Sequence, residues 1–165
     1  GPTAAAYVEQ QKVLQAKNAE ESAQKEIKEK NREENKQKAR DLIPILLDEV
    51  LAGNSGDIGK ISVSNKLCFS ADDSYDDYFH QNFGKKLVSK DETAAYCGIF
   101  DAGPTIRVMI FAGTKSGVDA GSIAREISTI LGGSGGGDAK FAQGGGKDTS
   151  KKEQAIAKAK SMILG

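Results

Sequence analysis

The sequence predicts an α+β fold, in which a mixed sheet packs against helices and a long N-terminal helical arm precedes it. Two kinds of periodicity support this prediction. Several segments in the middle of the chain alternate apolar and polar residues, which is the period of a strand. Others repeat apolar residues every three and four positions, which is the period of an amphipathic helix. Because the two kinds of segment are interspersed, a sheet covered by helices is expected.

Length and charge limit the function classes. The 165 residues fit one ordinary domain plus an appendage. Lysine and arginine total 23, as do aspartate and glutamate, so nucleic-acid binding would need a local basic patch. No apolar run reaches the roughly 18 residues of a membrane span and no secretory leader begins the chain, so we predict a cytoplasmic protein without a membrane partner. We interpret Gly1 and Pro2 as a tag scar, and the chain as a piece of a longer protein.

Cysteine and histidine are scarce. Cys68 and Cys97 form no disulfide framework, and we predict two free thiols that are buried or half-buried. The single histidine, His80, lies among aromatic residues in a predicted helix. Nowhere do nitrogen, sulfur and carboxylate ligands cluster locally, so the sequence predicts no catalytic residue, no metal site and no cofactor.

The N-terminal arm is predicted to be helical because residues 3–40 contain neither glycine nor proline and are rich in Ala, Glu, Lys and Gln. A coiled-coil seam needs apolar residues that repeat every three and four positions over several heptads. The arm satisfies this spacing only in its first half. Two interpretations stay open. The arm is either a solvated helix leading into the globular part or a segment that pairs with a second copy in a homodimer.

The globular domain is predicted to begin where apolar residues become dense, so residues 1–41 form the arm and residues 42–165 form the domain. We expect a helix break near Asp41, followed by a short buried helix over residues 42–51. Pro44 suits the first turn of such a helix, where its missing N–H would have had no partner.

The next segments alternate between strand and helix. Residues 53–57 read as a turn, and residues 60–70 as a strand that is interrupted at Ser64 and Asn65. A helix follows from Tyr75 to Leu87, with residues 71–74 supplying its cap.

A hairpin is predicted next. Strands over residues 94–100 and 105–111 are joined by Asp-Ala-Gly-Pro, which is turn chemistry. The second strand carries bulky residues on both faces, which indicates a central strand covered on both sides. Asp119 is expected to cap a helix over residues 123–131, and Ser150 with Glu153 forms a capping box for the last helix.

Between these two helices lies a glycine-rich loop, residues 132–146. The stretch from Leu131 to Asp148 contains eight of the chain's 19 glycines, with Phe141, Ala142 and Gln143 between two glycine runs. Flexible linkers have similar composition, but they seldom contain an aromatic residue. We therefore expect a shaped and rigid segment.

The order of glycines, followed by Phe141-Ala142-Gln143 and Gly145-Gly146, resembles the C-terminal domain of alanyl-tRNA synthetases, within the wider family of DHH-associated domains. The phosphoesterase members usually carry a histidine in this loop. This chain has none there, and it has no Asp-His-His motif, so the substrate-binding half of a phosphoesterase is the weakest alternative. At residues 138–140 this chain has Asp-Ala-Lys, where the synthetase domains more often have Arg-Pro-Asp. The acidic and the basic residue therefore stand in each other's place.

The resemblance implies a non-catalytic part of an alanine-tRNA ligase. Such a domain contacts the elbow of alanine-specific tRNA, helps to link aminoacylation and editing, and contributes to dimer formation. Carried over by position, the RNA-binding residues would be Gly135, Gly136, Gly137, Lys140, Phe141, Gln143, Gly144, Gly145, Gly146 and Lys147.

The residues themselves leave alternatives open. Phe141 either stacks on a base or fills the core, and Gln143 is a candidate to hydrogen-bond the loop's own main chain. Six lysines after Asp138 form a local positive patch or simply the solvated face of the last helix. Asp138 and the neutral net charge favour a dimerisation or protein-interaction domain with reduced tRNA binding.

Overall fold

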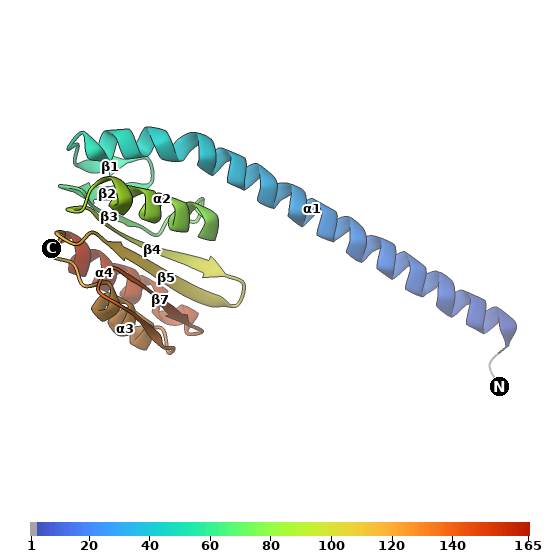
Figure 1. Cartoon of the computed structure of the whole chain (residues 1–165). Helices are drawn as coiled ribbons and strands as arrows, with labels where there is room; N and C mark the ends of the chain where they lie inside the picture. The colour runs from blue at the N-terminus through green and yellow to red at the C-terminus, as the bar shows by residue number, and fades with distance from the viewer. Residues whose placement is uncertain (1–2) are drawn as a thin grey trace. The chain divides into compact units, whose positions relative to one another are not determined.

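The structure, a computed structural model, describes residues 3–165, so the predicted tag scar Gly1-Pro2 lies outside the described residues. The predicted fold class is confirmed: a seven-stranded mixed sheet is combined with helices, and a long helix precedes it (Figure 1). No helix of residues 3–165 has both the length and the apolar character needed to cross a membrane.

The elements follow one another in the order helix, three strands, helix, hairpin, helix, hairpin, helix. The helices are α1 (Ala4–Leu51), α2 (Asp77–Lys90), α3 (Ala120–Ile130) and α4 (Lys152–Leu164), with a 3-10 turn η1 (Thr149–Lys151) before α4. The strands are β1 (Gly56–Ile58), β2 (Ile61–Ser64), β3 (Leu67–Ser70), β4 (Ala95–Ala102), β5 (Thr105–Ala112), β6 (Gly135–Gly137) and β7 (Phe141–Gly146).

The strands lie in the order β1-β2-β3-β4-β5-β7-β6. Neighbouring strands are antiparallel except β3 and β4, which are parallel. The connection between β3 and β4 passes through α2, as a parallel pair requires. The chain then leaves β5 through α3 and returns as β7, which pairs antiparallel with β5.

The predicted helix break near Asp41 is wrong, because α1 continues to Leu51 with Pro44 inside it. The chain divides into two compact units between Lys38 and Ala39, so the last part of α1 belongs to the same unit as the sheet. The last part of α1 buries Ile43, Leu47 and other apolar side chains. Burial of each such side chain contributes roughly 1.5 to 3 kcal/mol, which offsets the cost of about 3 kcal/mol for an internal proline. Tertiary packing therefore outweighs the local signal.

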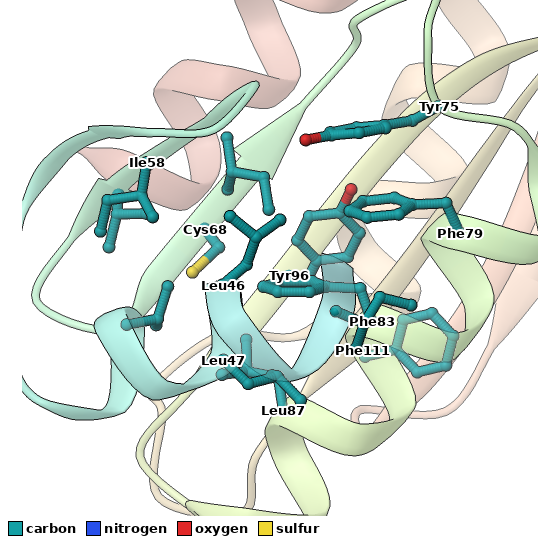
Figure 2. Close-up of a cluster of buried hydrophobic side chains, with 14 of the residues drawn as sticks. Leu46, Leu47, Ile58, Cys68, Tyr75, Phe79, Phe83, Leu87, Tyr96 and Phe111 are labelled. Carbon is teal, nitrogen blue, oxygen red and sulfur yellow. The ribbon is translucent and has the colours of Figure 1, made fainter. Parts of the chain in front are cut away.

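Two apolar clusters cover the two faces of the sheet. One contains side chains of the end of α1, of α2 and of the sheet, including Leu46, Phe83 and Tyr96 (Figure 2). The other contains side chains of α3, α4 and the opposite face of the sheet, including Ile127 and Ala159. We call the first the α2-side cluster and the second the α3-side cluster, and the two faces of the sheet the α2-side face and the α3-side face.

The β2-β3 and β4-β5 pairs confirm the predicted strand interruption and the predicted hairpin. Asn65 and Lys66 form the turn between β2 and β3 with positive φ angles of 47° and 67°. β5 is also confirmed as a strand with apolar clusters on both faces. β1 was missed, because residues 56 and 57 were assigned to a turn and a three-residue edge strand carries too little periodicity.

Helix caps are partly as predicted. The Asp119 side chain accepts a hydrogen bond from the N–H of Ser122 and caps α3, which confirms the prediction. α2 is capped by Asp76 rather than by residues 71–74. The predicted capping box of α4 is wrong: the Ser150 hydroxyl donates to Asp148 at 2.6 Å, and the 3-10 turn comes before the helix.

The cysteines are free and buried, which confirms the prediction. Cys68 belongs to the α2-side cluster and Cys97 to the α3-side cluster. Burial raises the pKa of Cys68 to about 12 and also raises the pKa of Cys97. Both side chains therefore act as small apolar groups within the core.

Candidate functional site

The glycine-rich segment is a β-hairpin rather than the predicted loop. After a turn at residues 132–134, β6 and β7 pair antiparallel, and β7 pairs with β5. Consecutive glycines have low strand propensity, so the sequence of the segment alone does not indicate strands. The main chain of β5 offers hydrogen-bonding partners to β7, and the hairpin forms one edge of the sheet, with β6 outermost.

Close packing against α3 explains why glycine is needed in the hairpin. A Cβ on Gly144 would collide with the Ser128 hydroxyl of α3 and would lie 2.7 Å from the Cα of Gly135. Gly145 has a φ of +151°, which L side chains rarely adopt, and its N–H donates to the same Ser128 hydroxyl at 3.0 Å. Ser128, itself buried, therefore fixes the position of β7 on α3.

The structure does not bring the predicted glycines together on one open surface. Gly136 and Gly137 are exposed, whereas Gly135 and the run 144–146 are only partly accessible. Gly133 also approaches the β7 main chain too closely for a Cβ. Most of these glycines thus allow close packing within the chain itself.

Asp138 shapes the tip of the hairpin. Its Oδ1 accepts hydrogen bonds from the N–H groups of Lys140 at 2.8 Å and Phe141 at 2.9 Å. The bonds from Phe141 and Lys140, together with the Lys140 charge, lower the pKa of the Asp138 carboxyl. The Lys140 carbonyl in turn accepts from the N–H of Ala112 at 2.7 Å, so the tip is tied to the end of β5.

Phe141 and Gln143 are exposed on β7, in alternation with buried Ala142. The Phe141 ring lies 4.9 Å from the ring of Phe111 on β5, yet 39% of Phe141 remains accessible. Phe141 therefore packs on Phe111 and still presents aromatic surface, and its stacking on a base stays a prediction.

Arg107 of β5 was missed by the sequence analysis. Its Nη2 donates to the Gln143 Oε1 at 2.9 Å, and its Cζ lies 5.7 Å from the centre of the Phe100 ring. Gln143 is thus held by a side chain rather than by the loop's main chain. The available signal was that Arg107 is the one charged residue of a mostly apolar strand, but the β5-β7 pairing that brings it to Gln143 cannot be read from the sequence.

Lys147 extends this arrangement beyond the end of β7. It is exposed, and it lines a concavity of about 320 Å³ together with Arg107 and Gly145. We call Arg107, Phe141, Gln143 and Lys147 the β7 row. It combines two cations, an amide and an aromatic ring at one edge of the sheet.

The six lysines of the predicted patch do not lie on one surface, because some belong to α4 and others flank β7. Lys152 forms ion pairs with Asp101 at 3.0 Å and Asp73 at 3.4 Å, and Lys158 pairs with Glu126 at 3.4 Å. Both lysines belong to α4, which packs with α3 on the opposite face of the sheet. Lys140 and Lys147, at the two ends of β7, remain exposed.

Neither a metal site nor His80 adds to the β7 row. Within residues 3–165, no three His, Cys, Asp or Glu side chains converge as metal ligands. His80 is fully buried in the α2-side cluster, where its Nδ1 lies 2.6 Å from the Tyr96 hydroxyl. The side chains of the row themselves offer positive charge, hydrogen bonding and an aromatic surface.

Comparison with known proteins agrees with this fold. The DHHA1 domain matches residues 64–164. An alanine-tRNA ligase of Nitrosopumilus maritimus is 66% identical over 165 residues, which are 100% of this chain and 19% of the ligase. A second alanine-tRNA ligase, from Cenarchaeum symbiosum, is 49% identical over 130 residues, which are 78% of this chain and 14% of that ligase.

A solved structure is similar in fold. The C-Ala domain of Aquifex aeolicus alanyl-tRNA synthetase superposes with a TM-score of 0.52 and 24% identity, covering 64% of this chain and 99% of that one. The resemblance predicted from the glycine-rich segment is thus confirmed, and the similarity is to a part of a ligase. Because the DHHA1 match extends over most of the residues, the chain belongs to the DHHA1 domain family.

Proposed function

We propose that the chain is the non-catalytic tRNA-binding domain at the C-terminal end of an alanine-tRNA ligase. The observation that carries the proposal is the 66% identity to an alanine-tRNA ligase over all 165 residues. In this role the domain contacts the elbow of alanine-specific tRNA, helps to link aminoacylation and editing, and acts in the cytoplasm in protein biosynthesis.

The β7 row supports this proposal through its chemistry. Arg107 and Lys147 provide cations for phosphate oxygens, which dominate the affinity of proteins for nucleic acids. The exposed part of Phe141 offers a surface on which a base stacks. From Phe141 to Lys147 the chain spans roughly 20 Å, so these contacts are spread along a stretch of RNA backbone rather than at one nucleotide.

Titration of tRNA against the chain tests the proposal. We expect weak binding that falls steeply between about 50 and about 200 mM salt. Replacing both Lys140 and Lys147 by alanine should weaken binding several-fold and reduce the slope of log K against log salt by roughly 1.5 to 2, because two phosphate contacts are lost. Fluorescence anisotropy with labelled tRNA measures both quantities.

Lys160→Ala is the matched control, since Lys160 is an exposed lysine of α4, on the opposite face of the sheet from α2. It removes one positive charge, as each of the two substitutions in the double variant does, and should leave the affinity almost unchanged. Equal losses in the control and in the double variant would show that the RNA surface is not at β7. Absence of binding at low salt would refute the tRNA-binding role.

Dimerisation through the helical arm is a second candidate function. Large apolar side chains in the first part of α1 are exposed, among them Tyr7 at 61%, Val13 at 63% and Leu14 at 49%. Such side chains on a solvated helix are the kind that a second helix covers in a coiled coil. The apolar spacing holds only over the first half of the arm, so a short seam is expected.

Sedimentation of the full chain tests the arm. Leu14→Glu should lower the average mass towards that of a monomer, because it places a charge within the apolar seam. Gln15→Glu introduces the same charge at the next exposed position and should leave the mass unchanged. A wild-type chain that sediments as a monomer at high concentration would exclude pairing through the arm.

A further inference from the structure

A groove lies next to the β7 row, between α2 and the hairpin tip. Its volume is about 420 Å³, within the range of small-molecule sites. Gln81, Lys85 and Val88, spaced as one stripe of α2, form one wall. Phe111 lies between them and the opposite wall, which Lys140 and Phe141 provide. The groove therefore has an apolar interior and a cation on each side.

We propose that this groove binds a single unpaired nucleobase of an RNA whose backbone runs along the β7 row. The inference rests on the proposed function and names the feature of the RNA that the site recognises. Bases that are splayed out of a helix stack on aromatic side chains, whereas paired bases inside a duplex do not expose their faces. Phe141 is the residue shared by the row and the groove, so it connects backbone contact with base contact.

Charge in the groove is complementary to an RNA strand. Lys85 and Lys140 are exposed, and neither forms an ion pair among residues 3–165. The one acidic residue of the lining, Glu92, is occupied on both oxygens: Oε1 pairs with Lys115 at 2.9 Å and Oε2 accepts from Thr114 at 3.3 Å. The flanking ammonium groups are thus available for the phosphates on either side of an inserted base.

Phe111 and the wall formed by the hairpin tip are held in place by contacts within the chain. Phe111 is only 6% accessible and is held in the α2-side cluster. The opposite wall is held by the Ala112 to Lys140 hydrogen bond and by the turn at Asp138, whose Oδ1 is engaged by two N–H groups. A preformed site loses little conformational entropy on binding, which favours selection of the base by shape.

The experiment compares two RNA hairpins that differ by one bulged adenosine, each titrated against the full chain by fluorescence anisotropy. We expect the bulged RNA to bind on the order of tenfold more tightly, the effect of stacking one base. Phe141→Leu should remove this preference, and Lys85→Ala, on the exposed face of α2, should reduce it. Lys147→Ala should weaken both RNAs equally, because it belongs to the row and not to the groove.

The outcomes separate this inference from the proposed function. Equal binding of both hairpins by the wild type, with tRNA still bound, overturns the groove and leaves the tRNA-binding role standing. A preference that persists in both Phe141→Leu and Lys85→Ala also overturns it. If neither the hairpins nor tRNA binds, both proposals fail. Quenching of 2-aminopurine placed at the bulge, present in the wild type and lost in Phe141→Leu, supports the groove directly.

Discussion

Replacing Gly144 by alanine is expected to lower the free energy of unfolding by about 2 to 3 kcal/mol. The added methyl group would meet the Ser128 hydroxyl, whose rotation would break its hydrogen bond with Gly145, and the main chain of Gly135 on β6, which itself packs closely on α3. Overpacking of this kind typically costs about 1 to 3 kcal/mol. Loss of the hydrogen bond from Gly145 to Ser128 adds to the cost. Urea unfolding followed by circular dichroism measures the change.

Gly136→Ala is the control from the same hairpin. A Cβ at Gly136 meets nothing within 4 Å, and its φ is not positive. The change should alter the free energy of unfolding by no more than about 0.5 kcal/mol, as surface substitutions usually do. If the two variants lost equal stability, the hairpin would not be packed on α3 as described.

Lowering the pH from 7 to 4 is expected to reduce the free energy of unfolding by about 3 kcal/mol through His80 alone. Burial lowers the pKa of His80 to about 4 from its usual 6.5, with Tyr75 and Asp77 opposing the shift. Between these values the unfolded chain binds a proton that the folded chain does not. The stability is therefore fully present above pH 6.5 and is lost as the pH falls towards 4.

His80→Phe identifies this contribution. A phenyl ring keeps the stacking on Phe100, which lies 5.1 Å from the imidazole, but it cannot be protonated. The variant should be less stable than the wild type at pH 7, because the Tyr96 hydroxyl loses its hydrogen bond with His80. Its stability should nevertheless change much less between pH 7 and pH 4.5. An unchanged pH dependence would mean that another group is responsible.

Local patterns were enough to predict most elements. The alternation in β5, the cap at Asp119 and the interruption near Asn65 each depend on neighbouring residues, and each is present in the structure. Pro44 shows the limit of such reasoning, since a strong local breaker lies inside α1 where buried side chains outweigh it. Local chemistry predicts an element well only when packing does not oppose it.

The candidate site was only partly predictable, because it is assembled by pairing of distant strands. The family pattern drew attention to Phe141 and Gln143, but Arg107 and Lys85 come from elements whose positions the sequence does not reveal. The glycines illustrate the same point. Their composition suggested contact with a ligand, whereas at Gly144 the partner is α3 of the chain itself.

Both outermost strands of the sheet, β1 and β6, are only three residues long. An unpaired strand edge is a template on which another polypeptide can add a strand, and long apolar edges promote aggregation. Three glycines at one end and Gly-Asp-Ile at the other present few side chains against which an incoming strand would pack. The sheet is thereby protected from edge-to-edge polymerisation, even though it does not close into a barrel.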